Sequence, residues 1–115
     1  PYLFEGTLPD FNVGTDGGKS CAKEVEQIVE STCSAADGYS SVLNGRFKGG
    51  WTTRNYGQPR QNIHAIQLEI AQTTHLSVET PRFDYDQKKA ARLQIHLKTI
   101  LEKLAILAPS LGAIS

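Results

Sequence analysis

The sequence contains no methionine, and its 115 residues include only two cysteines and one tryptophan. It also lacks net charge, because 12 basic residues balance 12 acidic ones. A neutral chain is not typical of a strongly basic nucleic-acid binder or of an acidic disordered tail. The longest uninterrupted apolar run, residues 104–108, is far shorter than the roughly 20 residues that a membrane helix needs. We therefore expect a soluble globular domain with no nucleic-acid partner and no membrane partner.

The start of the chain also lacks two features. It begins at Pro1 without an initiator methionine, and no charged segment followed by an apolar one resembles a signal peptide. Either a leader has been removed or the chain is a piece of a longer protein, and we expect the second. Taken by themselves, residues 1–115 have the length of a single domain.

The two cysteines, Cys21 and Cys33, are 12 positions apart in a segment that we predict to be one helix. That spacing corresponds to about 18 Å along a helix, whereas a disulfide needs Cα atoms within about 7 Å. We therefore expect both thiols to be free in a reducing compartment such as the cytoplasm. The three histidines match no standard zinc spacing, so we expect no metal site made by this chain alone.

Helices are predicted near both ends of the chain. A stripe of apolar residues predicts a helix over 20–36, with Ser20 as its N-cap and a glycine after its last turn. A second and longer apolar stripe predicts a helix that begins at Asp84 and is stopped by Pro109. We expect His96, which lies between polar neighbours in the second helix, to be solvated.

Strands are predicted between the helices. Residues 39–43 and the β-prone residues 51–56 are candidates, and alternating apolar side chains predict a strand over 62–71. The first 19 residues are rich in glycine and proline and are expected to be irregular. The order of loop, helix, strands and helix indicates an α/β domain.

Charge is unevenly distributed along the chain. Residues 38–61 contain four basic residues and no acidic one, which fits either an anion site or a solvated loop. Glu69 lies near the end of the otherwise apolar strand predicted over 62–71. A carboxylate there is either in use at a ligand crevice or exposed on an edge strand, and the residues alone leave both interpretations open.

Two longer motifs resemble a known family. They are Asn44-Gly45-Arg46-Phe47-Lys48-Gly49-Gly50-Trp51-Thr52-Thr53-Arg54-Asn55-Tyr56-Gly57 and His64-Ala65-Ile66-Gln67-Leu68-Glu69-Ile70-Ala71-Gln72. Together with Leu8-Pro9-Asp10-Phe11-Asn12-Val13-Gly14-Thr15 and Ser20-Cys21, they resemble N-formylglutamate amidohydrolases in order and spacing over nearly the whole chain.

This resemblance implies a fold and a reaction. The fold would be a mixed sheet flanked by helices, like that of the zinc-dependent exopeptidases (the phosphorylase/hydrolase-like fold). The reaction would be hydrolysis of N-formyl-L-glutamate to formate and L-glutamate in histidine degradation. Members of the family are longer, and their metal ligands precede the matched segment. The chain would then be a C-terminal portion whose partner is the N-terminal remainder of the same protein. A divalent metal, zinc or cobalt, would belong to the whole enzyme, and we expect the 115 residues alone to be inactive.

The resemblance also assigns roles to residues of this chain. Glu69 would be the catalytic general base, acting on metal-bound water and passing the proton to the leaving amine. Arg54 would bind the carboxylate of the anionic substrate, because its planar guanidinium can donate two parallel hydrogen bonds. Tyr56, the Gly50 backbone and Arg46 would complete the substrate pocket.

One position departs from the family pattern, since Asn55 stands where relatives often have histidine. A role of that histidine in substrate binding or proton transfer is therefore not expected here. Two alternatives to the deformylase also remain open. One is a related amidohydrolase that acts on another N-acyl amino acid, and the other is a non-catalytic module that binds small anions.

Overall fold

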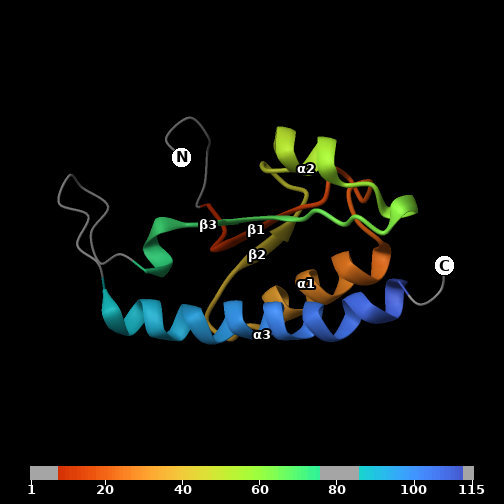
Figure 1. The fold of residues 1–115 in the computed structure, drawn as a ribbon. Helices are drawn as coiled ribbons and strands as arrows, with labels where there is room; N and C mark the ends of the chain where they lie inside the picture. Colours follow the sequence, from red (N-terminus) through yellow and green to blue (C-terminus); the bar gives the residue numbers. More distant parts are fainter. Residues whose placement is uncertain (1–7, 76–85, 113–115) are drawn as a thin grey trace.

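A computed structural model describes residues 8–75 and 86–112 of the chain. A three-stranded mixed sheet forms the centre of the fold. Its strands are β1 (Phe11–Gly14), β2 (Ser41–Leu43) and β3 (Gln67–Ile70), in the order β2-β1-β3 (Figure 1). The central strand β1 pairs in parallel with β2 and antiparallel with β3. This confirms the expected α/β class and the mixed character of the sheet.

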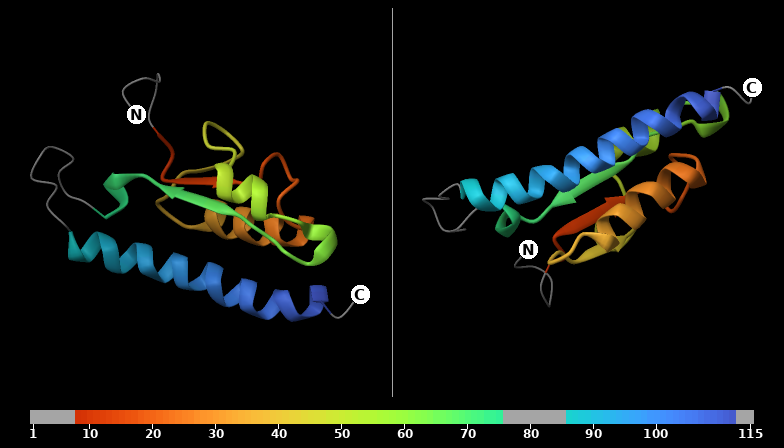
Figure 2. Two further views of the ribbon diagram at one scale, coloured as in Figure 1. Left: turned by 45° about the horizontal axis from the view of Figure 1, so that its top comes forward. Right: turned by 90° about the horizontal axis from the view of Figure 1, so that it is seen from below.

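Helices lie on both sides of this sheet. The helices α1 (Lys23–Ala35) and α3 (Gln87–Gly112) lie side by side below it in Figure 1, and the short helix α2 (Trp51–Tyr56) lies above it (Figures 1 and 2). One-turn 3₁₀ helices, η1 (Pro59–Gln61) and η2 (Gln72–Thr74), precede and follow β3. In the described part of the chain, no helix combines the length and the apolar character that crossing a bilayer requires.

The hydrophobic core lies between the sheet and the two longer helices. The side chains of Phe11 and Val13 point from β1 into this layer and are almost completely buried. They pack with residues of α1 and α3, and partly buried side chains from the other strands close the cluster, among them Leu43, Leu68 and Ile70. The apolar residues that alternate along β3 therefore face the helices, as their spacing predicts.

The structure corrects three predictions of strands and loops. Residues 51–56 form a helix rather than a strand, because Gly50 starts a helical turn and Thr53 is buried against Gly49. The strand predicted over 62–71 is confined to Gln67–Ile70. The segment expected to be irregular contains β1, whose four residues are too few to show a clear alternation.

Two predicted helix features also differ, and a third is not tested. Ser20 is not an N-cap: α1 begins after Ala22, and the Ser20 hydroxyl donates instead to the carbonyl of Ala65 at 2.7 Å. Pro109 does not stop α3, which runs through it to Gly112. The predicted cap Asp84 lies outside the described residues. Asp86 accepts hydrogen bonds from the first backbone N–H groups of α3.

Both cysteines are free and buried, as expected. Cys21 lies just before α1 and Cys33 lies in its last turn. Burial raises the pKa of each thiol to about 11, and nearby acidic residues add to the shift. A thiol with so high a pKa is a poor nucleophile at neutral pH, so Cys21 is a core residue.

A backbone crossing holds the loop that follows β2 against the sheet. At Gly14, the last residue of β1, an added Cβ would lie 2.7 Å from the Gly49 nitrogen and 2.8 Å from the Lys48 carbonyl carbon. The Asp16 N–H donates to the Lys48 carbonyl at 2.6 Å beside this crossing. Only glycine permits such a close approach of two backbones.

Replacing Gly14 should therefore destabilise the chain. We expect Gly14→Ala to lower the free energy of unfolding in urea by about 2 kcal/mol or more, because the opposing atoms are backbone and cannot rotate away. Gly50→Ala is the matched control, since its Cβ would meet only the Gln67 side chain, at 3.4 Å. Equal losses of unfolding free energy in the two variants would show that the backbones do not approach closely at Gly14.

Candidate active site

The sheet face opposite the core carries polar side chains. Along β1 and β3, Asn12, Gln67 and Glu69 alternate with the core residues and so point away from α1 and α3. The antiparallel register places Asn12 opposite Glu69 and Gly14 opposite Gln67. Glu69 is exposed on the outer strand β3, whereas Asn12 is 1% exposed.

A buried hydroxyl fixes the loop that borders this face. Thr15 follows β1 and is fully buried. Its Oγ1 donates to Glu26 Oε2 on α1 at 2.5 Å and accepts from the side-chain amide of Asn44 at 2.9 Å. The Asn44 oxygen in turn accepts from the Thr15 N–H at 2.9 Å. Because Asn44 begins the loop after β2, these bonds tie that loop to both β1 and α1.

The end of this loop is joined to Glu69 through one side chain. The Gly50 N–H donates to Gln67 Oε1 at 2.7 Å, and Gln67 Nε2 donates to Glu69 Oε1 at 3.2 Å. Since a backbone N–H can only donate, the Gln67 oxygen must face Gly50, which leaves its NH₂ group for the carboxylate. Two of the predicted site residues, Gly50 and Glu69, are thus brought together by Gln67, which sequence reasoning missed.

Asn12 is a second polar residue that sequence reasoning did not assign. Its side-chain nitrogen donates to the Pro9 carbonyl at 2.8 Å and to the Glu69 carbonyl at 3.4 Å. Its Oδ1 is buried and has no hydrogen-bond donor among the described residues. The only signal in the sequence is a polar residue between two apolar ones, Phe11 and Val13.

The predicted substrate-binding residues Arg54 and Tyr56 both lie on α2, which Gly50 starts. Both side chains are exposed, and the Tyr56 ring meets the Trp51 ring edge-on at 5.8 Å. In residues 8–75 and 86–112, no hydrogen bond or ion pair joins Arg54 or Tyr56 to Glu69. Asn55 folds back on its own helix and donates to the Trp51 carbonyl at 2.7 Å.

Arg46 is half-buried in the loop between Asn44 and Gly50. The other end of α2 is fixed at Gly57, where an added Cβ would lie 2.4 Å from the Ser20 carbonyl oxygen. The site residues of this segment are therefore carried by a loop and a short helix that are held at both ends.

The described residues do not form a metal centre. No three of their His, Cys, Asp and Glu side chains come together in a way that could hold an ion. His64 uses Nδ1 to accept the Ala22 N–H at 2.9 Å, and its Nε2 is buried without a partner among these residues. His96, predicted to be solvated, is half-buried and packs edge-on against Tyr39 at 5.0 Å. The donor set available here therefore does not fit a divalent metal.

Comparison with known proteins decides the family. The model of the N-formylglutamate amidohydrolase family matches residues 1–76. The chain belongs to this family. It is 50% identical over 104 residues to proteins named N-formylglutamate deformylase from Pseudomonas aeruginosa and from Pseudomonas putida.

A solved structure has the same fold. The crystal structure of an N-formylglutamate amidohydrolase from Ralstonia eutropha JMP134 superposes on 96% of this chain with a TM-score of 0.73 at 20% sequence identity. The chain covers 37% of that structure and 39% of each Pseudomonas relative. It thus spans about two-fifths of the length of the curated relatives that it matches.

The bridge made by Gln67 can be tested without an activity assay. We expect Gln67→Met to speed amide hydrogen exchange at Gly50 by about fivefold to tenfold, the effect of losing one hydrogen bond worth about 1 kcal/mol. Gln72→Met, at an exposed position on η2, is the matched control and should leave this rate unchanged. An unchanged rate in Gln67→Met would show that the bridge does not form.

Proposed function

We propose that the whole protein hydrolyses N-formyl-L-glutamate to formate and L-glutamate, with Glu69 as its general base. The observation that carries this proposal is the chain of hydrogen bonds from Gly50 through Gln67 to Glu69. It orients an exposed carboxylate in a family whose relatives are named for this deformylation. A general base needs such orientation toward the proton that it removes.

In the proposed reaction Glu69 accepts one proton and later returns it. Glu69 takes a proton from water while the water oxygen forms a bond to the formyl carbon of the substrate. The resulting tetrahedral intermediate then breaks its bond between carbon and nitrogen. The leaving amine receives the proton from Glu69, so formate and glutamate are released and the carboxylate is restored. Gln67 acts as a positioning residue, since it holds one Glu69 oxygen and leaves the other for the water.

Substrate recognition is assigned to the loop and helix beside Glu69. The substrate carries two carboxylates, and residues 38–61 supply four basic side chains without an acidic one. We assign Arg54 to one substrate carboxylate because a guanidinium can form two parallel hydrogen bonds with it. The Gly50 backbone, Tyr56 and Arg46 would shape the remainder of this pocket.

The metal belongs to the rest of the protein in this proposal. The divalent ion implied by the family resemblance, zinc or cobalt, would take its ligands from residues outside those described. The whole enzyme would then have the zinc-exopeptidase-like fold, act in histidine degradation and reside in the cytoplasm. The free, buried thiols of Cys21 and Cys33 are consistent with that reducing compartment.

The partner of this chain would be the N-terminal remainder of the same protein, and the chain would be its C-terminal domain. The outer strands β2 and β3 each keep one edge that pairs with no other described strand. The large apolar side chains of Ile95, Leu101 and Ile106 on α3 are 64–79% exposed. An open sheet edge is a template for pairing with another segment, and such edges fit a chain that spans two-fifths of the length of its relatives.

Substitution of Glu69 tests the proposed role. In the full-length protein, Glu69→Gln should lower kcat for N-formylglutamate by about 10²–10⁴ with little change in KM, because the amide cannot accept the proton. Glu102→Gln, an exposed position on α3, is the matched control. The 115-residue chain supplied with zinc or cobalt should show no turnover. Full activity of Glu69→Gln would exclude the general base, and a wild-type full-length protein that binds N-formylglutamate without any turnover would be an anion-binding module.

Substitution of Arg54 tests the substrate. We expect Arg54→Gln to raise KM for N-formylglutamate at least about tenfold, because a charge-assisted hydrogen bond is worth about 1.5–3 kcal/mol. Lys98→Gln, also basic and exposed but on α3 and outside residues 38–61, should leave KM unchanged. If the wild-type protein prefers N-formyl derivatives of neutral amino acids, the role of Arg54 is wrong and the protein acts on another N-acyl amino acid.

A further inference from the structure

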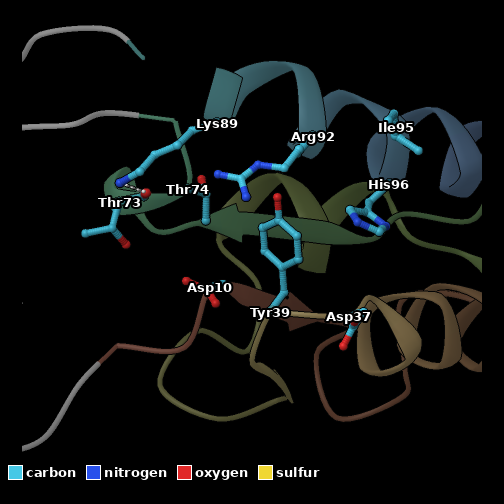
Figure 3. Close-up of a pocket in the computed structure, with 10 residues that line it drawn as sticks. Asp10, Asp37, Tyr39, Thr73, Thr74, Lys89, Arg92, Ile95 and His96 are labelled. Carbon is cyan, nitrogen blue, oxygen red and sulfur yellow. Dashed lines mark hydrogen bonds between the residues drawn. The ribbon is translucent and has the colours of Figure 1, made fainter. Parts of the chain in front are cut away.

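A polar cavity away from the candidate active site lies between α3 and the segment that joins α1 to β2. Its volume is about 450 Å³, within the range of small-molecule sites. Figure 3 shows its walls: Lys89, Arg92 and His96 extend from α3 along one side, and Asp10 and Asp37 lie on the other, with Tyr39 between them. Glu69, Gln67, Gly50 and Arg54 do not line it.

The side chains of Arg92, Asp10 and Asp37 line the cavity without forming ion pairs with one another. In the part of the chain that the structure describes, the Arg92 side chain makes no ion pair or hydrogen bond, and neither Asp10 nor Asp37 makes an ion pair. Asp10 uses Oδ2 to accept from the backbone and hydroxyl of Ser40. The Arg92 guanidinium and the carboxylates of Asp10 and Asp37 therefore share one cavity but stay more than 4 Å apart, which leaves room for a molecule between them.

The middle of the cavity is aromatic and held in place. The Tyr39 ring lies between two others, with its centroid 5.2 Å from that of Phe11 and 5.0 Å from that of His96. In Figure 3 the phenol group points toward Arg92. The Lys89 ammonium donates to the Thr73 carbonyl at 3.2 Å and so joins the first turn of α3 to η2, the turn after β3. The cavity thus has an ordered apolar floor between its basic and acidic walls.

We propose that this cavity binds a small zwitterion, a molecule with a primary ammonium and a carboxylate joined by a short apolar chain. The carboxylate would pair with Arg92, whose guanidinium can donate two parallel hydrogen bonds, and the ammonium would pair with Asp37 and Asp10. The apolar chain would cover the Tyr39 ring. A simple anion would meet the two carboxylates and a simple amine would meet the two basic groups, so neither satisfies both walls.

A set of three probes of the same length tests this selectivity. We would titrate the chain with ε-aminocaproate, hexanoate and hexylamine and follow the backbone amides of Gly38 and Thr74 by NMR. We expect saturable shifts with ε-aminocaproate and binding at least about tenfold weaker for the other two. Equal binding of hexanoate would show an anion site, equal binding of hexylamine a cation site, and no saturable shift would exclude a site for this class. Each of these results would overturn the proposal.

Variants separate the cavity from general effects of charge. Arg92→Gln and Asp37→Asn should each abolish saturable binding of ε-aminocaproate, whereas Lys98→Gln, at an exposed position of α3 that does not line the cavity, should retain it. Urea unfolding midpoints equal to that of the wild type would show that the variants are folded. Retained binding in Arg92→Gln or Asp37→Asn would overturn the proposal. The proposal does not depend on the deformylase activity, so the two can fail separately.

Discussion

The buried hydroxyl of Thr15 is the interaction on which the geometry of the candidate active site depends. It lies at the end of the central strand and bonds to α1 through Glu26 and to the loop after β2 through Asn44. That loop can then cross Gly14 closely enough to place Gly50 beside Gln67. These contacts lead in turn to the hydrogen bond that orients Glu69. The position of the carboxylate therefore depends on Thr15, a residue distant from it in the sequence.

Periodic apolar patterns were sufficient to predict the larger elements. The alternation of Ile66, Leu68 and Ile70 identifies the core side of β3, and the stripe through Leu93, Leu97 and Ile100 identifies the buried side of α3. Local propensity failed at Trp51–Tyr56, where β-prone residues form a helix because the preceding loop fixes their first turn. The strand β1 was missed because its pairing partners lie about 30 and 57 positions away.

The candidate site was predictable only in part, because some of its contacts also join residues that are distant in the sequence. Motif resemblance singled out Glu69, Gly50, Arg54, Tyr56 and Arg46, and the structure joins the first two through a side chain that no pattern marked. Gln67 gains its role only when Gly50, 17 positions earlier, lies against it. The same holds for the cavity beside α3, where Tyr39 and Arg92 become neighbours only in the fold.

The turn at Asn44 has a consequence for how the protein ages. An asparagine followed by glycine is prone to lose its amide nitrogen, because the next backbone nitrogen can attack the side-chain carbonyl when no bulky residue shields it. In the folded chain that amide is engaged with Thr15 through both its oxygen and its nitrogen, so it must leave these bonds before it can react. Once converted to aspartate, the side chain would lose its donor to Thr15 and add a negative charge to the cluster that contains Glu26. The chemical lifetime of the site is therefore tied to how often this one turn opens.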